Sequence, residues 1–262
     1  MSPRVVIPIA LVVALLAVAA GGPGAGAAGR CAGKQVTIEG TDGKDRLRGT
    51  RRSDVIAAGD GSDLIQALGG NDTICAGDGG DRVQGGDGRD RIYGEEGSDF
   101  IVGGRAKDLL SGGDGGDYLE ENHGDGRIEG GEGDDWMLGG AGIDTGEGGP
   151  GDDTFSAGVG FDTLVGGSGN DTLEPEAGED VVDGGAGSDT AVYAHEGAAV
   201  VVDLSRHSTT QAAGRDSLPS IENLTGSSFD DTLFGDAGPN VLKGGPGEDR
   251  LVGNGGDDTI LQ

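Results

Sequence analysis

The chain has 262 residues, of which 59 are glycine, about three times the usual share, and only 3% are aromatic. Its 47 acidic residues against 18 lysines and arginines give a formal net charge of −29. This charge argues against nucleic-acid binding and against attachment to anionic membranes, because both need a basic face. Two classes of chain remain, a disordered acidic polymer and an acidic protein that compacts only with cations.

Residues 1–28 are predicted to be a cleavable export signal. Arg4 supplies a short positive start, an apolar run follows over 5–20, and small residues fill 21–28. A membrane anchor is the alternative, but the apolar run contains Pro8 and is shorter than the roughly 20 residues that a spanning helix needs. We therefore expect a secreted, extracellular protein with no membrane span once the signal is removed.

A short N-terminal cap, residues 29–39, precedes the repeats and carries Cys31. The only other cysteine, Cys75, lies in an early repeat. Because an oxidising compartment favours disulfides, we expect a bridge that ties the cap to the repeats. Two independent thiols are the alternative.

From residue 40 to residue 192 the chain divides into 17 nonapeptides without an insertion, and residues 85–93, GGDGRDRIY, are a representative unit. Position six is aspartate in 16 of the 17 units, and Gly126 is the exception. Position eight is almost always apolar. Gly146 and Ala191 are small residues at that position, so we expect weak local packing around them.

Each nonapeptide predicts one turn and one short strand. Glycines in the first four positions favour a tight turn over the first six residues, and the last three residues place one apolar side chain between two outward ones. Such units bury their apolar side chains only by stacking, so the pattern predicts an all-β solenoid with two units per 18-residue coil and two parallel sheets. One aliphatic side chain per half-coil is a thin core for so much glycine, and a further stabilising interaction is needed.

The sixth-position aspartates supply that interaction. Residues 18 apart stack at strand spacing, so Asp81 lies beside Asp99 and their carboxylates repel unless a cation separates them. Calcium takes six to eight oxygen ligands in irregular geometry, whereas magnesium demands a tight octahedron and zinc prefers cysteine and histidine. The sequence therefore predicts multiple Ca²⁺ ions in the turns.

The pattern G-G-x-G-x-D-x-U-x, with U apolar, resembles the RTX (repeats-in-toxin, hemolysin-type) calcium-binding repeat over residues 40–192 and about 217–261. This resemblance implies a parallel β-roll in which calcium lies between adjacent turns, held by sixth-position aspartates and turn carbonyls. Carried to the matching positions, it implies metal ligands at Asp45, Asp63, Asp72, Asp81, Asp90, Asp99, Asp117, Asp135, Asp144, Asp153, Asp162, Asp171, Asp180, Asp189, Asp249 and Asp258.

The two edges of the predicted roll differ. The odd-numbered units keep aspartate at position six from Asp45 to Asp189, which predicts a continuous calcium row, here called the odd row. The even-numbered units form the even row, which is irregular over 103–126, where we predict a gap. Arg105 and Lys107 would stand in there for the missing dication.

Two alternatives to a functional gap stay open. The first is sequence drift without consequence. The second is a partner site, since His123 and the outward-facing Trp136 lie near the gap.

The frame stops after residue 192. Residues 193–216 are predicted to form a β-rich connector, and residues 217–262 a second short repeat array. Phe229 at a glycine position and Asn240 at an aspartate position weaken the case for calcium sites in that array.

No segment outside the repeats is long enough to hold a catalytic domain, and His123, His195 and His207 lie in loops without a catalytic motif. We therefore expect a non-enzymatic, secreted calcium-binding protein that folds on export. It would serve as a structural, adhesive or interaction module with an extracellular or cell-surface protein or glycan partner. The alternative is a calcium-dependent folding or accessory subunit for a separate secreted hydrolase.

Overall fold

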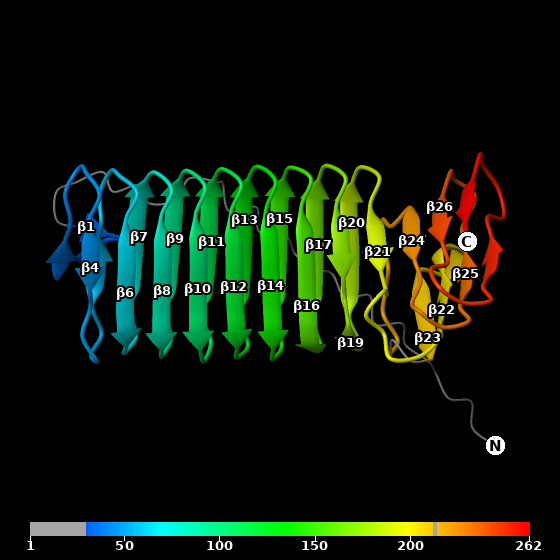
Figure 1. The fold of residues 1–262 in the computed structure, drawn as a ribbon, viewed down its shortest axis with the longest axis horizontal. Helices are drawn as coiled ribbons and strands as arrows, with labels where there is room; N and C mark the ends of the chain where they lie inside the picture. Colours follow the sequence, from blue (N-terminus) through cyan, green and yellow to red (C-terminus); the bar gives the residue numbers. More distant parts are fainter. Residues whose placement is uncertain (1–29, 212–213) are drawn as a thin grey trace, which may run out of the picture.

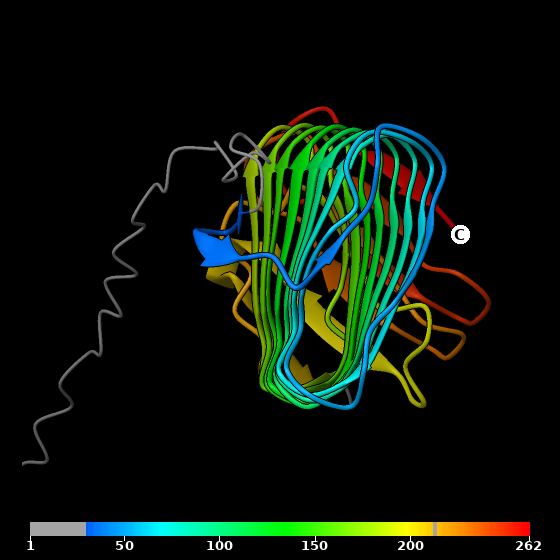
Figure 2. The ribbon, with the colours of Figure 1, turned by 90° about the vertical axis from the view of Figure 1, so that its left-hand side faces the viewer.

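The computed structural model describes residues 30–211 and 214–262, so the predicted signal over 1–28 lies outside the described residues. The chain winds as a flattened coil whose strands stack side by side along one long axis (Figures 1 and 2). Within the first repeat array the strands pair in parallel with strands 18 residues away, as in the register of Phe100 with Tyr118 and of Ile101 with Leu119. The predicted parallel β-roll with two units per coil is confirmed.

Sheet 1 contains the strands that follow the odd-numbered turns and continues into the C-terminal array. Its members are β4 (Arg46–Arg48), β6 (Leu64–Gly69), β8 (Arg82–Asp87), β10 (Phe100–Arg105), β12 (Tyr118–His123), β14 (Trp136–Ala141), β16 (Thr154–Gly160), β18 (Thr172–Glu174), β21 (Thr190–Val192), β24 (Asn223–Thr225), β26 (Val241–Lys243) and β28 (Thr259–Leu261), with β19 (Ala177–Gly178) paired to β16.

Sheet 2 contains the strands that follow the even-numbered turns and lies across the core from sheet 1 (Figure 2). Its members are β3 (Ile38–Glu39), β5 (Val55–Ala57), β7 (Thr73–Asp78), β9 (Arg91–Glu96), β11 (Leu109–Asp114), β13 (Arg127–Glu132), β15 (Thr145–Pro150), β17 (Thr163–Ser168) and β20 (Val181–Ala186).

Twelve strands between β6 and β20 are six residues long, whereas the nonapeptide pattern predicted three. Each strand takes the last three positions of one unit and the first three of the next, as β10 does, which leaves only a three-residue turn. The glycine-rich positions pair like the rest of the strand: Gly104 is in register with Gly86, and the Gly97 N–H donates to the Asp114 carbonyl at 2.7 Å. The six-residue turn predicted from glycine content was therefore wrong, because main-chain pairing between coils continues the strands through these glycine positions.

In the first array the core is formed mainly by the apolar side chains at position eight of the units. Ile92, Ile101, Leu110 and Leu119 are fully buried. The weak packing predicted at Gly146 is not found, because the fully buried ring of Phe155 from the facing sheet fills the space. A Cβ atom on Gly146 would lie 2.0 Å from Cε1 of that ring.

After β21, sheet 1 continues without a break, whereas sheet 2 ends and a separate sheet takes its place. Sheet 1 runs on from β21 to β24, with Thr190 in register with Asn223. Beyond β20 the opposite face is a separate four-stranded sheet, which follows the main body in Figure 1. This sheet contains β22 (Val200–Asp203), β23 (Ser208–Gln211), β25 (Thr232–Phe234) and β27 (Arg250–Val252), and the 3-10 helix η1 (Leu204–Arg206) links β22 to β23.

The N-terminal cap is a two-stranded antiparallel ribbon, β1 (Arg30–Cys31) and β2 (Lys34–Gln35). Cys31 forms a disulfide with Cys75 of β7, with the two Cα atoms 5.8 Å apart, so the predicted bridge is confirmed. Over residues 30–211 and 214–262, no helix has the length and apolar character needed to cross a membrane.

Candidate metal centres along the turns

The sixth-position aspartates form two rows of stacked carboxylates, one at each edge of the roll. Each aspartate lies directly before a strand, and in most of them the backbone N–H donates to Oδ1 of the aspartate 18 residues later. Asp81 donates in this way to Asp99, and Asp99 to Asp117, each at 2.8 Å. The same bond recurs at 2.7–2.9 Å from Asp45 to Asp189 in the odd row, and from Asp54 to Asp108 and Asp144 to Asp180 in the even row.

The second oxygen of most of these carboxylates is buried and has no hydrogen-bond partner among the residues that the structure describes. An unpaired buried carboxylate oxygen is costly, because it loses hydration without compensation. The Oδ2 atoms concerned belong to Asp63, Asp72, Asp81, Asp90, Asp99, Asp108, Asp117, Asp135, Asp144, Asp153, Asp162, Asp171, Asp180, Asp189 and Asp249. All the predicted ligands except Asp45 and Asp258 are in this set.

In the units that begin with glycine, the missing side chain makes room for these oxygens. A Cβ atom on Gly94 would lie 2.2 Å from Oδ2 of Asp99 and 2.4 Å from the carbonyl oxygen of Gly112 in the next coil. A carboxylate oxygen and a main-chain carbonyl of adjacent coils therefore face the same point beside Gly94. Charged and neutral oxygens of this kind are the ligands that calcium prefers, so the residues present fit that ion.

Burial and mutual repulsion make these carboxylates hard to ionise without a cation. Burial raises the pKa of Asp99 to about 8; the N–H of Asp81 opposes this rise, and the negative charges of Asp117 and Asp81 add to it. Burial likewise raises the pKa of Asp135 and of Asp162 to about 7. At neutral pH the carboxylates of each row therefore favour binding either protons or cations.

The first aspartate of each row differs from the later ones in its hydrogen bonds. Oδ2 of Asp45 accepts hydrogen bonds from the N–H and hydroxyl of Thr41, at 2.7 and 2.8 Å. Thr50 satisfies Asp54 in the same way. The first carboxylate of each row is therefore paired within its own turn, although Asp45 was among the predicted ligands.

Two acidic residues of the connector region extend the rows, and sequence reasoning missed both. Asp180 donates its N–H to Oδ1 of Asp216 at 3.0 Å, and Asp189 donates to Oε2 of Glu222 at 2.9 Å. The Tyr193 hydroxyl donates to Oδ2 of Asp216 at 3.3 Å, so this oxygen is paired. The signal for both was the acidic-x-apolar triplet of the repeat, DSL at 216–218 and ENL at 222–224.

The gap predicted over 103–126 does not interrupt the row of carboxylates. Asp108 donates its N–H to Oε1 of Glu121 at 3.1 Å, and Gly126 donates to Oδ1 of Asp144 at 2.7 Å. Arg105 does not enter the row; its Nη1 lies 3.7 Å from Oδ1 of Asp87, and both side chains are largely exposed. The prediction assumed that only position six supplies carboxylates, and here Glu121 supplies one from position one.

A separate cluster of possible ligands lies outside the rows. Glu174, Glu176 and His195 each place one ligand atom within 4.8 Å of the others. His195 Nδ1 lies 3.3 Å from Oε2 of Glu174, and the His195 side chain is 71% exposed. Ser156 donates its hydroxyl to Glu176. These carboxylates are less deeply buried than those of the rows.

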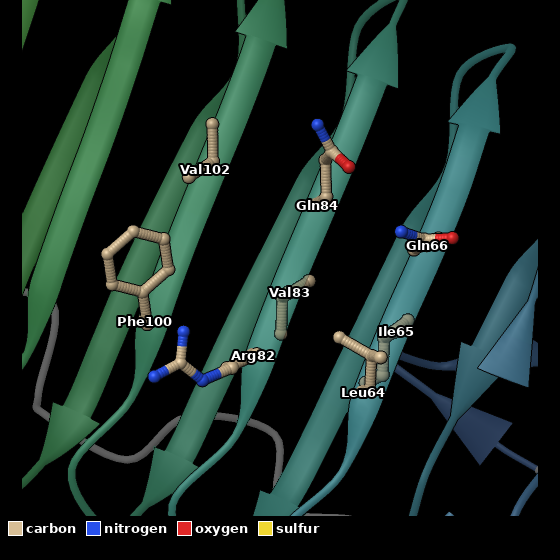
Figure 3. A pocket seen from close by; sticks show the side chains of 8 residues that line it. All are labelled: Leu64, Ile65, Gln66, Arg82, Val83, Gln84, Phe100 and Val102. Carbon is tan, nitrogen blue, oxygen red and sulfur yellow. The ribbon is translucent and has the colours of Figure 1, made fainter. Parts of the chain in front are cut away.

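The outward face of sheet 1 carries a group of neighbouring aromatic side chains. The rings of Phe100 and Tyr118 stack with centroids 4.7 Å apart, and the Arg82 guanidinium lies 5.6 Å from the centre of the Phe100 ring. Trp136, on the next strand, is 55% exposed, as predicted. Figure 3 shows the shallow hollow beside these rings, which has no acidic side chain in its lining and is distinct from the carboxylate rows; the lining residues are Leu64, Ile65, Gln66, Arg82, Val83, Gln84, Phe100 and Val102.

Comparison with known families gives one match, and it recurs along the chain. The profile described as RTX calcium-binding nonapeptide repeat (4 copies) matches residues 39–74, 76–110, 93–120, 124–146, 147–182, 156–191 and 225–260. No curated protein matches the chain.

Proposed function

This chain belongs to the family of RTX calcium-binding nonapeptide repeat proteins, and from that premise we propose that it is an exported, non-enzymatic module whose β-roll forms when calcium binds. Calcium binding and the parallel β-roll are properties of the repeat itself. The assignment of individual ligands, the export route and the role outside the cell are the proposal.

The observation that carries the proposal is the series of buried, unpartnered Oδ2 atoms along both edges. We assign the calcium ligands to the aspartates that own these atoms, together with turn carbonyls such as that of Gly112. Bound calcium would supply the positive charge that offsets the repulsion between stacked carboxylates. Oδ2 of Asp45 is already paired with Thr41, so we assign Asp45 a lesser role than the interior aspartates.

Calcium is a folding partner because the other stabilising terms are small. Most half-coils bury one apolar side chain, while the many glycines of the repeats lose backbone entropy on folding and the chain carries a formal net charge of −29. When the metal site is unformed in the unfolded chain, the free energy of calcium binding contributes to the free energy of folding. Folding would therefore follow exposure to calcium outside the cell.

Two features support an exported location. Residues 1–28 have the composition of an export signal, and the disulfide between Cys31 and Cys75 suits an oxidising compartment. Outside the cell the rigid roll would act as a structural, adhesive or interaction module. The outward-facing aromatic side chains of sheet 1, Phe100, Tyr118 and Trp136, support the interaction role.

Circular dichroism of the purified protein during a calcium titration, reversed with EDTA, tests this proposal. We expect a cooperative transition from coil to β structure in calcium and little change in the same concentration of magnesium. Magnesium serves as the control because it carries the same charge but does not accept an irregular oxygen cage. A protein that is fully folded in EDTA would contradict calcium-dependent folding.

A further inference from the structure

The nonapeptide at residues 121–129, ENHGDGRIE, is the only unit of 40–192 without aspartate at position six. It is also the only one with an acidic residue at position one. Position one is otherwise glycine or alanine, apart from Pro175. The unit has therefore lost a carboxylate at one position and gained one at another.

The Glu121 side chain occupies the place of the missing aspartate. Glu121 is fully buried, and its Oε1 accepts the N–H of Asp108, the bond that the aspartate 18 residues ahead makes in other coils. A Cβ atom on Gly126 would lie 2.5 Å from Cδ and 2.7 Å from Oε1 of Glu121. Gly126 is not among the residues with positive φ, so glycine is needed here for space rather than for backbone conformation.

The other carboxylate oxygen of Glu121 also resembles the second oxygen of the aspartates in the rows. Oε2 is buried and, within residues 30–211 and 214–262, has no hydrogen-bond partner, like the Oδ2 atoms of the aspartates. A Cβ atom on Gly103 would lie 2.7 Å from this Oε2 and 2.8 Å from Oδ2 of Asp108, which is also unpartnered. Two buried, unpaired carboxylate oxygens thus converge beside Gly103.

The charges around Glu121 are of one sign. Asp108, Asp144 and Asp90 all act on it electrostatically, and with burial they raise its pKa to about 9, burial being the largest cause. Lys107 acts on Asp144 in the opposite direction. A carboxyl group in this place is either protonated or paired with a cation.

We propose that Glu121 is a calcium ligand that replaces the missing sixth-position aspartate, so that the even row binds an ion between the coils of Asp108 and Glu121. This inference rests on the proposed function, because it assumes that the other turns bind calcium. It makes the even row continuous and assigns a ligand that the repeat pattern does not contain. The competing account is a neutral glutamic acid that only fills space.

The first test counts bound ions by native mass spectrometry in saturating calcium. Glu121→Gln keeps the size and the acceptor for the Asp108 N–H but removes the charge. We expect this variant to bind at least one calcium ion fewer than the wild type. The matched control is Glu120→Gln, the same change at the adjacent residue, which points outward and accepts the Tyr118 hydroxyl at 3.3 Å. The control should bind the wild-type number.

A second test restores the repeat pattern. Because the Glu121 side chain fills the space at position 126, Gly126→Asp alone is expected to crowd the turn and lower the thermal stability in calcium. The double variant E121G/G126D should fold normally and bind as many ions as the wild type. Gly126→Asp would thus destabilise the wild type but be tolerated in the Glu121→Gly background. Only a carboxylate that moves between the two positions predicts this difference.

The outcomes separate the two accounts. An E121Q variant with the full number of ions, or an E121G/G126D variant with more ions than the wild type, would overturn the assignment of Glu121. If E121Q does not fold, the double variant decides the question alone. A wild-type protein that binds no calcium would instead refute the proposed function, so the two failures are distinguishable.

Discussion

The ring of Phe155 occupies the space beside Gly146 on the facing sheet, where a Cβ atom at position 146 would lie 2.0 Å from Cε1 of the ring. At this level of the core, one large side chain takes the space that two side chains share elsewhere. We therefore expect Gly146→Val, which restores the apolar residue of the repeat pattern, to destabilise the protein by about 1–3 kcal/mol through overpacking. Thermal unfolding in excess calcium measures the change.

The control for this prediction is the same substitution without the ring. Phe155→Ala alone should cost about 3–5 kcal/mol, and adding Gly146→Val to that variant should restore part of the loss. A Gly146→Val protein that is more stable than the wild type would show that the Phe155 ring does not fill this space.

Interior and terminal aspartates of one row should respond differently to neutralisation. Asp99→Asn keeps the acceptor for the Asp81 N–H but removes the charge of a carboxylate whose second oxygen is unpaired. We expect the calcium concentration at the folding midpoint to rise by about three- to tenfold, because calcium affinity follows ligand charge. Circular dichroism during a calcium titration gives the midpoint.

Asp45→Asn is the matched control, because Thr41 already pairs the second oxygen of Asp45. Its midpoint should remain close to that of the wild type. Equal shifts in the two variants would argue against the assignment of calcium to the unpaired oxygens.

The disulfide is expected to stabilise the first coils more than the rest of the roll. It joins Cys31 of the cap to Cys75 of β7 across a sequence separation of 44, and such a cross-link contributes about 2–4 kcal/mol. Because each coil contacts mainly its neighbours, C31S/C75S should lose local stability there. Hydrogen exchange in calcium should show faster exchange near β5 and β7 and little change near β14. Uniform exchange along the chain would contradict a local role.

Without calcium, the folded protein is expected to gain stability as the pH falls. The folded-state pKa is raised from 3.8 to about 8 for Asp99 and to about 7 for Asp135 and Asp162. Between about pH 4 and pH 8 the folded state therefore binds more protons than the unfolded state, so the free energy of unfolding decreases as the pH rises. In EDTA the protein should show more β structure at about pH 5 than at about pH 8.

Calcium should reverse this dependence, because protons and calcium compete for the same carboxylates. The calcium concentration at the folding midpoint is expected to be higher at about pH 5 than at about pH 8. Sodium chloride at matched ionic strength controls for the screening of charge repulsion by salt. A roll that is more folded at about pH 8 than at about pH 5 in EDTA would contradict the raised pKa values.

The sequence by itself determined the period, the fold class and the main rows of carboxylates. A nonapeptide frame unbroken over 40–192 leaves one way to bury every eighth-position side chain, which is to stack coils of 18 residues. The same arithmetic places Asp81 beside Asp99. The disulfide was also within reach, because only Cys31 and Cys75 were available to form it.

Only the tertiary structure decided which atoms share a place in space. Position in the repeat did not show that the Phe155 ring fills the space beside Gly146, or that Thr41 pairs the first aspartate of the odd row. It also predicted a gap where Glu121 reaches the place of residue 126. The physical reason is that the repeat fixes the backbone, while long side chains from other positions can enter the same volume, and sequence spacing alone does not say which of them does.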